Sequence, residues 1–365
     1  MENKINQKLF FIAILIILAA CNSKDTEKKT VNNDTNLVNV ANSIQVNSPE
    51  NGKVFSLGDK IKVIFNNLSL QNKDSISISI NQKPFYRFDI DGGNIILNTD
   101  SLSLGRNSIQ IELKTLHESK FAQLQVVLKA AHPPLEYTYK VIKSFPHDDK
   151  SYTQGLEFYN GIMYEGSGQY GESMLRRYKL ETGQLLQSYN LPNNVFGEGI
   201  VIYKNKIYQL TWQSHIAYEY DLESFKLIRT FEFNTEGWGI TKYNDLLVMS
   251  DGSNTLYFLN PETFTEVKRI EVYNHIGPVT YLNELENIGG KIYANVYQTD
   301  DIVIINPENG VVEGKINFKN LLNKNKVKRQ VDVLNGIAYD FATKRMFVTG
   351  KYWPEIYQVE IMAKK

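Results

Sequence analysis

Four short stretches place a polar or aromatic side chain just before, or at the start of, a strand-like run. They are SYTQGLEF from Ser151, FGEGIVIY from Phe196, EGWGITKY from Glu236 and LNELENIG from Leu282. In each stretch, one residue directly precedes the glycine or leucine that opens the strand. These residues are Gln154, Glu198, Trp238 and Glu284. A carboxyl group among aromatic side chains can exchange a proton near neutral pH, because desolvation raises its pKa. These stretches are therefore candidates for acid–base chemistry if the fold brings them together.

Glu198 is the candidate proton shuttle, and Lys351 is the candidate cation. The glycines on either side of Glu198 let the backbone approach a substrate, and Phe196 can shield the carboxyl from water. Lys351, in TGKYW, could stabilise a developing oxyanion. From the residues alone, a solvated turn glutamate and a surface lysine remain open interpretations of these two positions.

Two carboxamides and three indoles complete the candidate set. Gln154 and Asn283 can donate to a substrate carbonyl and accept from an amine, although turn capping is the alternative role, especially for asparagine. Trp212, Trp238 and Trp353 are the only tryptophans of the chain, and all three lie near these motifs. Packing between sheets is the alternative role for them.

The segment 137–365 repeats a unit of about forty residues, the length of a β-propeller blade. Its first four units begin at Gly155, Gly199, Gly239 and Leu285. Each unit contains four strand-like runs, and the related motifs LETG, LESF, NPETF and NPENG precede the last run. Four strands at this spacing are typical of a propeller blade.

A fifth unit, which begins at Gly336, supplies only three strands. The run YTYKVIKSF at 137–145 resembles the outer strands of the other units and can supply the fourth. We therefore expect a five-bladed β-propeller over 137–365, closed by pairing of its first strand with its last blade, which leaves no exposed sheet edge. The starts of the innermost strands would then meet at one mouth of the central channel.

The N-terminus, 1–21, has the pattern of a lipoprotein signal peptide. Lys4 and Lys8 precede the apolar run LFFIAILIIL, which is short for a membrane span. The following LAAC, which ends at Cys21, resembles the bacterial lipobox, whose cysteine receives lipid; an ordinary signal peptide with an incidental cysteine is the alternative. We expect a lipid-anchored protein of the bacterial cell envelope, facing the periplasm or lying on the outer-membrane surface.

Two further segments separate the anchor from the repeats. Residues 22–43 are polar and can bury little surface, which predicts a flexible tether. Residues 44–131 contain six or seven short alternating runs between Gly, Asn and Asp turns, a pattern typical of a small immunoglobulin-like β-sandwich. Cys21 is the only cysteine, so the chain can form no intrachain disulfide and no cysteine metal site. The expected fold class is all-β, a sandwich followed by a propeller.

Charge and histidine spacing exclude several kinds of partner. The 365 residues include 40 basic and 40 acidic side chains, so there is no basic excess that would indicate nucleic-acid binding. The histidines form no HxxH or HExxH motif, and there is no aspartate-rich calcium loop; they are His117, His132, His147, His215 and His275. We expect a monomer that needs no metal and no other cofactor, and in which HDDK at 147–150 orders the loop before Gln154.

A long ordered set of motifs resembles the plant and bacterial glutamine cyclotransferases. It comprises FPHDDKSYTQGLEF, YEGSGQYGESMLRRYKLETG, FGEGI, LTWQ, LNELE, NVYQTDDIVIINPENG and VLNGIAYD followed by FVTGKYWPEIYQV. The resemblance covers the repeat array and none of the first domain. Members of this family are five-bladed propeller enzymes that convert N-terminal glutamine to pyroglutamate. The resemblance therefore implies peptide or protein substrates with N-terminal glutamine.

The resemblance also assigns roles to individual residues. It implies that Glu198 is the catalytic glutamate and that Lys351 is a pocket lysine. The substrate-binding residues would be Tyr152, Gln154, Phe196, Trp212, Trp238, Asn283 and Tyr297. Tyr152 stands where the family pattern usually has phenylalanine, and Tyr297 where it usually has tryptophan. Both keep an aromatic face and add a hydroxyl, so we expect activity to survive with a changed rate or substrate preference.

The implied chemistry matches the candidate groups. Pyroglutamate forms when the α-amine attacks the side-chain carboxamide carbon and ammonia leaves. The reaction needs a group that accepts the amine proton and returns it to the leaving nitrogen, and donors for the developing oxyanion. The alternative is a non-enzymatic propeller lipoprotein that binds peptides or glycans without releasing ammonia. A lactonase on the same scaffold is a third option, but it would normally use a calcium ion whose ligands are missing here.

Overall fold

The computed structural model describes residues 43–66, 75–115, 118–323, 325 and 327–364. These residues form strands β1 to β29 and no α-helix, so the all-β prediction is confirmed. Within these ranges, no helix is long and apolar enough to cross a membrane. The predicted signal peptide, Cys21 and nearly all of the predicted tether lie outside the described residues.

The first nine strands form two sheets. One sheet has the order β1-β3-β7-β6, with β1 (Val46–Ser48), β3 (Lys60–Phe65), β7 (Asn94–Asn98) and β6 (Phe88–Asp91). The other has the order β2-β9-β8-β4-β5, with β2 (Lys53–Ser56), β9 (Ser119–Lys129), β8 (Gly105–Lys114), β4 (Ser75–Ile80) and β5 (Lys83–Phe85). Burial alternates along β8, where Ile109 and Ile111 are buried next to exposed neighbours. The period of two in the sequence therefore reflects sheets with one buried face.

The expected six or seven strands are an undercount for this region. β1 and β2 have three and four residues, too few to show an alternating pattern. The run KPFYRFDI at 83–90, which reads as a single run in the sequence, divides into β5 and β6, which belong to different sheets. The division falls at Tyr86 and Arg87, where the chain passes from one sheet to the other.

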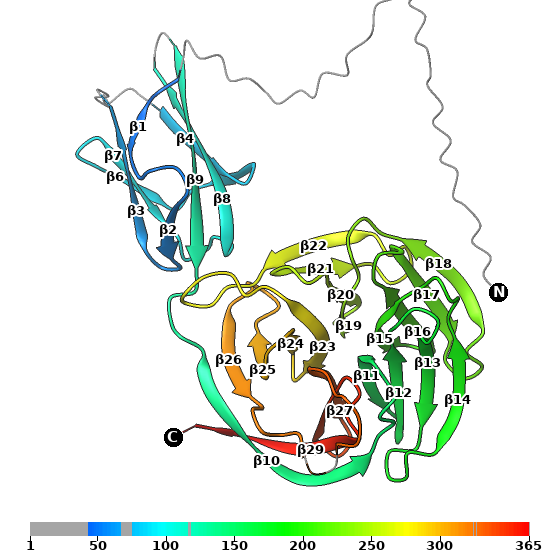
Figure 1. Cartoon of the computed structure of the whole chain (residues 1–365). Helices are drawn as coiled ribbons and strands as arrows, with labels where there is room; N and C mark the ends of the chain where they lie inside the picture. Colours follow the sequence, from blue (N-terminus) through cyan, green and yellow to red (C-terminus); the bar gives the residue numbers. More distant parts are fainter. Residues whose placement is uncertain (1–42, 67–74, 116–117, 324, 326, 365) are drawn as a thin grey trace, which may run out of the picture. The chain divides into compact units, whose positions relative to one another are not determined.

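The remaining strands form three four-stranded antiparallel sheets and one eight-stranded sheet. The eight-stranded sheet consists of two antiparallel groups of four, joined by the parallel pairing of their outermost strands. The five groups surround a common centre in Figure 1. The first group is β11 (Thr153–Tyr159), β12 (Ile162–Ser167), β13 (Met174–Tyr178) and β14 (Leu185–Asn190). The second is β15 (Gly197–Tyr203), β16 (Lys206–Thr211), β17 (Ile216–Asp221) and β18 (Leu227–Glu232). The third is β19 (Ile240–Tyr243), β20 (Leu246–Ser250), β21 (Thr255–Leu259) and β22 (Glu266–Glu271). The fourth is β23 (Leu282–Ile288), β24 (Lys291–Val296), β25 (Asp301–Ile305) and β26 (Val312–Asn317).

The fifth group takes its outer strand from the start of the array. It consists of β27 (Leu334–Asp340), β28 (Arg345–Gly350), β29 (Glu355–Ala363) and β10 (Leu135–Pro146). β10 pairs antiparallel with β29 over nearly its whole length, and its first residues also pair in parallel with β26. The predicted closure of the array by its first strand is therefore confirmed.

The first strand of each group lies innermost, and β11, β15, β19, β23 and β27 contact one another in a ring. Burial falls from the centre outward: all seven residues of β15 are buried, whereas β18 is largely exposed. Glycines permit the close approach of the inner strands. A Cβ on Gly155 would lie 2.3 Å from the Ile200 nitrogen, and one on Gly239 would lie 2.0 Å from the Asn283 oxygen. The glycines after Gln154 and Trp238 therefore serve packing at the centre.

Closure of the ring makes a testable contribution to stability. Phe145 of β10 is 2% exposed and packs against Phe347 of β28 at a centroid distance of 5.9 Å. We expect Phe145→Ala to lower the free energy of unfolding by about 3–5 kcal/mol, because it leaves a cavity between the first and last strands. Urea unfolding followed by tryptophan fluorescence measures this, since every tryptophan lies in the array.

The control on the same strand is Ile142→Ala, because Ile142 is 47% exposed. This variant should change the free energy of unfolding by no more than about 0.5 kcal/mol. Equal losses in the two variants would contradict a closure that depends on Phe145.

Candidate active site

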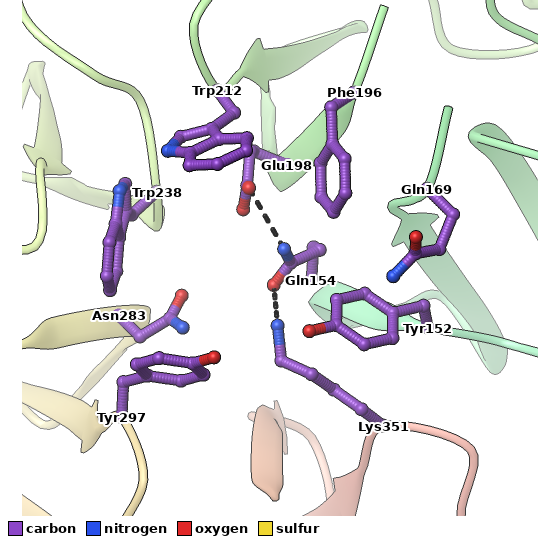
Figure 2. A pocket seen from close by; sticks show the side chains of 10 residues that line it. All are labelled: Tyr152, Gln154, Gln169, Phe196, Glu198, Trp212, Trp238, Asn283, Tyr297 and Lys351. Carbon is purple, nitrogen blue, oxygen red and sulfur yellow. Dashed lines mark hydrogen bonds between the residues drawn. The ribbon is translucent and has the colours of Figure 1, made fainter. Parts of the chain in front are cut away.

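One pocket gathers all nine residues that the sequence predicts for catalysis and substrate binding. Its volume is about 210 Å³, and Figure 2 shows its lining. The lining residues are Tyr152, Gln154, Gln169, Phe196, Glu198, Trp212, Trp238, Asn283, Tyr297 and Lys351. They come from all five groups of strands, either from the starts of inner strands or from adjacent loops. The cyclic arrangement therefore brings together residues that are up to about 200 positions apart in the sequence.

A chain of hydrogen bonds joins the two candidate catalytic groups through a carboxamide. Gln154 Nε2 donates to Glu198 Oε1 at 2.9 Å, and Lys351 Nζ donates to Gln154 Oε1. An ammonium group only donates, so the carboxamide oxygen must face Lys351 and the amide nitrogen must face Glu198. Asn335 Nδ2 donates to the same Gln154 oxygen at 3.3 Å and to the Thr153 carbonyl at 3.0 Å.

Burial moves the pKa values of the two groups toward each other. Glu198 is 4% exposed, and desolvation raises its pKa well above the usual range; the charge of Lys351 opposes this shift and that of Glu236 adds to it. Lys351 is 1% exposed, and burial lowers its pKa to about 8 against the opposing charges of Glu198 and Asp332. Each group can therefore change its protonation state closer to neutral pH than it would in water.

Aromatic rings surround this polar chain. Phe196 meets Tyr152 edge-on at 6.0 Å and Trp212 at 5.6 Å, and Trp238 meets Tyr297 at 5.6 Å. Lys351 Nζ lies 4.2 Å from the centroid of the Tyr152 ring and 5.7 Å from that of Tyr297. The face of an aromatic ring attracts a cation at these distances. Tyr152 and Tyr297, the two positions that differ from the usual family pattern, therefore help to stabilise the charged form of Lys351.

Glu284, which precedes the leucine that opens the fourth unit, is not the counterpart of Glu198. Glu284 does not line the pocket; it is 1% exposed and accepts the backbone N–H groups of Leu156 at 3.2 Å and Ile337 at 2.8 Å. The pairing of β23 with β24 shifts between Leu282 and Leu285, just as that of β15 with β16 shifts between Gly197 and Ile200. Asn283 is therefore the counterpart of Glu198 and faces the pocket, whereas Glu284 is the counterpart of Gly199. Glu284 instead ties three inner strands together.

Trp353 is a core residue and does not line the pocket. It is 4% exposed, and its indole donates to the Asp332 carbonyl at 2.8 Å. Sequence reasoning missed Gln169, which lines the pocket, and Asn335, which holds Gln154. The signal for Gln169 was available, because it lies in the motif YEGSGQYGES. A signal for Asn335 was available too, because it directly precedes Gly336, which opens the fifth unit, as Gln154 precedes Gly155 in the first.

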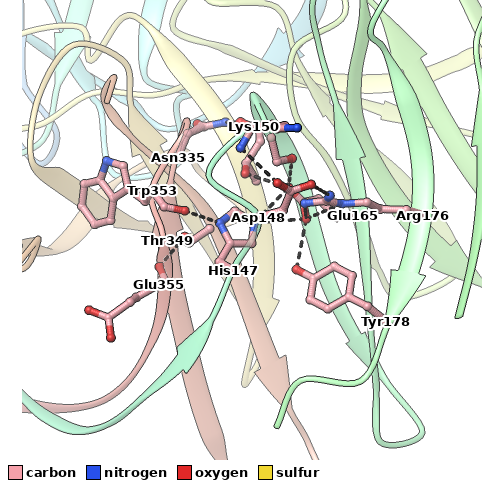
Figure 3. A network of polar contacts seen from close by, with 12 residues as sticks. His147, Asp148, Lys150, Glu165, Arg176, Tyr178, Asn335, Thr349, Trp353 and Glu355 are labelled. Atoms are coloured by element: carbon pink, nitrogen blue, oxygen red, sulfur yellow. Dashed lines mark hydrogen bonds and ion pairs between the residues drawn. The ribbon is translucent and has the colours of Figure 1, made fainter. Parts of the chain in front are cut away.

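A buried polar network fixes the loop that leads to Gln154 (Figure 3). Glu165 is fully buried and accepts hydrogen bonds from Thr153 at 2.8 Å, from Arg176 at 2.7 and 3.0 Å, and from Ser151. His147 lies 3.2 Å from Glu165 and 2.6 Å from the Trp353 carbonyl oxygen. The HDDK segment therefore orders this loop as expected. In the described part of the chain, no group of three or more His, Cys, Asp or Glu side chains is placed to hold a metal ion.

Comparison with known proteins points to one family. The sequence model of the family described as glutamine cyclotransferase matches residues 113–361. The glutaminyl-peptide cyclotransferase of Arabidopsis thaliana is 37% identical over 227 residues, which is 61% of this chain and 71% of that protein. The crystal structure of Myxococcus xanthus glutaminyl cyclase superposes with a TM-score of 0.60 at 33% identity, covering 64% of this chain and 100% of that one.

The Glu165 network predicts a specific acid sensitivity. Burial alone would raise the pKa of Glu165, but Arg176 and His147 outweigh it and hold the pKa well below the usual range. The ionised carboxylate thus stabilises the folded state above the unfolded-state pKa of about 4.3, and this stabilisation is lost as the pH falls below that value. We expect Glu165→Gln to lower the free energy of unfolding at pH 7 by about 3–5 kcal/mol, because Arg176 loses its buried carboxylate and keeps only the half-exposed Asp148 as a charged partner.

Urea unfolding at a series of pH values from neutral to acid measures this effect. The stability of Glu165→Gln should fall less steeply on acidification than that of the unmodified protein. Glu181→Gln is the control, since the Glu181 side chain is 59% exposed, and it should leave the pH dependence unchanged. Equal acid sensitivity of Glu165→Gln and the unmodified protein would contradict this role for Glu165.

Proposed function

Because the chain belongs to the glutamine cyclotransferase family, we propose that it converts the N-terminal glutamine of peptides or proteins to pyroglutamate and releases ammonia. The observation that carries this proposal is the carboxamide held between Glu198 and Lys351. The side chain of Gln154 is chemically the same group as the side chain of the substrate. The two catalytic candidates therefore already bind a glutamine carboxamide by its nitrogen and its oxygen.

In the proposed complex, the carboxamide of the substrate meets the same two groups. Its oxygen faces Lys351 and its nitrogen faces Glu198. Gln154 turns aside from these contacts and, with Asn283, offers donors to the substrate carbonyl and acceptors to its amine. The aromatic lining excludes water and holds the amine against the carboxamide carbon, so that a five-membered ring can close.

The proton follows the bond changes. As the amine nitrogen bonds to the carboxamide carbon, the ionised Glu198 takes a proton from that nitrogen. The carbonyl oxygen becomes negative, and the Lys351 ammonium stabilises it. Glu198 then returns the proton to the amide nitrogen, the carbon–nitrogen bond breaks, the carbonyl reforms and ammonia leaves. The acyl group has passed from one nitrogen to another, so the enzyme is an acyltransferase, and the steps involve no metal ion.

The proposal extends to the architecture and location of the protein. The five groups of strands would be the blades of a propeller over 137–365, supported by their cyclic order. The two sheets of 44–131 would be an immunoglobulin-like sandwich, supported by the alternating burial of their strands. Residues 1–21 would be a signal peptide with lipid attached at Cys21, and 22–43 a tether. The protein would then be a monomeric lipoprotein of the bacterial cell envelope.

The proton-shuttle role is tested by Glu198→Gln. This variant keeps the shape of the side chain but cannot carry the proton, so we expect kcat to fall by about 10²–10⁴-fold with folding and peptide binding retained. The assay follows ammonia and the corresponding mass loss from a Gln-initiated dipeptide, with and without a chelator, and the chelator should have no effect. Glu181→Gln, on an exposed turn, should match the unmodified protein.

Each other outcome of that assay has a clear meaning. Near-normal turnover by Glu198→Gln would remove Glu198 from the mechanism. Binding of the dipeptide by the unmodified protein without ammonia release would support the alternative, a non-enzymatic binding lipoprotein. Loss of turnover with chelator would contradict metal independence.

The pH dependence of turnover tests the role of Lys351. Its ammonium form stabilises the oxyanion, and burial lowers its pKa to about 8. Lys351 is therefore charged below that pH and loses its proton above it, so kcat should decline as the pH rises through about 8. Lys351→Met should lower kcat by about 10²–10³-fold and abolish this decline. An unchanged alkaline decline in Lys351→Met would show that another group titrates.

A further inference from the structure

One carboxylate oxygen behind the pocket wall accepts hydrogen bonds from both wall indoles. Trp212 Nε1 donates to Glu236 Oε2 at 2.8 Å, and Trp238 Nε1 donates to the same oxygen at 3.0 Å. The other carboxylate oxygen accepts from Gln213 Nε2 at 3.3 Å. An indole has a single polar atom, so each ring is tied at its only donor to one common point.

The shared acceptor connects two neighbouring groups of strands. Trp212 directly follows β16 of the second group, whereas Trp238 lies just before β19 of the third. The segment that carries Glu236 is itself held from both sides. The Thr235 carbonyl lies 2.7 Å from His215 Nδ1, and the Thr235 hydroxyl donates to Asp251 at 2.8 Å. Glu236 therefore presents its carboxylate from an anchored backbone.

Packing leaves each indole little other freedom. The Trp238 ring lies against Gly252, where an added Cβ would lie 2.6 Å from the ring carbons, and its edge meets Tyr297. Trp212 meets Phe196 at 5.6 Å. These contacts limit where the rings can lie, and the bonds to Glu236 select one orientation of each ring within those limits.

We propose that Glu236 is a positioning residue, whose carboxylate sets the orientation of Trp212 and Trp238 and thereby the shape of the pocket around Glu198. Glu236 does not line the pocket, so it acts through the indoles rather than on the substrate. A charged acceptor binds an N–H group about twice as strongly as a neutral one, which suits a group that must hold two rings. The consequence for turnover rests on the function proposed above.

The charge of Glu236 has a second effect in the same direction. Partial burial would raise its pKa, but the hydrogen bonds from Trp238, Trp212 and Gln213 outweigh this and hold the pKa below the usual range. The carboxylate is therefore ionised at neutral pH. Its negative charge adds to the burial that raises the pKa of Glu198. Glu236 thus holds the walls of the pocket and raises the pKa of the carboxyl group that accepts and returns the proton.

The indole protons give a direct test with an internal control. The chain has three tryptophans, so the whole protein labelled with ¹⁵N should show three indole N–H signals. Trp353 donates to the Asp332 carbonyl, remote from Glu236, and reports whether the fold is intact. In Glu236→Ala, the signals of Trp212 and Trp238 should move and that of Trp353 should not. Glu236→Gln keeps an acceptor oxygen, so its signals should stay closer to those of the unmodified protein.

Kinetics with a Gln-initiated dipeptide supply the second readout. We expect kcat/KM to fall by about tenfold to 100-fold in Glu236→Ala, because misplaced walls misalign the reacting groups. Glu236→Gln should recover most of this loss. Unmoved signals of Trp212 and Trp238 in Glu236→Ala would overturn the proposal, and so would moved signals with unchanged kcat/KM.

A second variant covers the case in which Glu236→Ala does not fold, which a changed Trp353 signal would reveal. Gly252→Ala leaves Glu236 in place and pushes on the Trp238 ring, and it also strains the backbone at Gly252, whose φ is +80°. The Trp353 signal again reports whether the fold is intact. In Gly252→Ala, the Trp238 signal should move, the Trp212 signal should stay and kcat/KM should fall. A moved Trp238 signal with an unaltered kcat/KM would overturn the proposal. If the unmodified protein bound the dipeptide without turnover, the proposed function would fail. The role of Glu236 would then be tested by the dissociation constant of the dipeptide, compared between the variants and the unmodified protein.

Discussion

The site depends on one energetic constraint, a carboxyl and an ammonium group buried in the same small pocket. Isolated charges are costly to bury, so both groups must be paired, and here a carboxamide from Gln154 lies between them. The arrangement keeps Glu198 and Lys351 apart, which leaves each free to act on a substrate carboxamide. It also needs a lining that excludes water, because water would return both groups to their ordinary protonation behaviour.

The fold meets this constraint by closing a ring. Inner strands approach closely at glycines such as Gly155 and Gly239, so the residues before them emerge around one narrow mouth. Pairing of β10 with β29 joins the two ends of the array and brings Lys351 beside Gln154 across the join. The buried network around Glu165 then fixes the loop that precedes Gln154. β11 and the loop before it therefore contribute both to the buried network that stabilises the fold and to the pocket.

The repeat array could be predicted from the sequence because each unit repeats the same turns. Its closure could be predicted because the fifth unit has only three strands and the run at 137–145 resembles the missing fourth. The pocket residues could be predicted because they stand at equivalent positions and in motifs of a known family. The position of Glu284 could not, because the fourth unit has no glycine where the second has Gly199, which displaces the apparent start of its inner strand by one residue. The passage of KPFYRFDI between two sheets was equally hidden, since no glycine, asparagine or aspartate marks the two residues, Tyr86 and Arg87, between β5 and β6. Glu236 was missed because it acts through two indoles, and hydrogen bonds between distant side chains leave no local pattern.

Burial in the pocket raises the pKa of Glu198, and the chemistry of the site depends on this shift. Infrared difference spectroscopy of the unmodified protein against Glu198→Gln isolates the stretching band of this one carboxyl group. Its intensity over a pH series gives the protonation midpoint directly, without turnover. We expect a midpoint well above the ordinary glutamate value of about 4.3, with protonated carboxyl still present at mildly acidic pH. A midpoint at the ordinary value would mean that the carboxyl is solvated, and it would contradict the account.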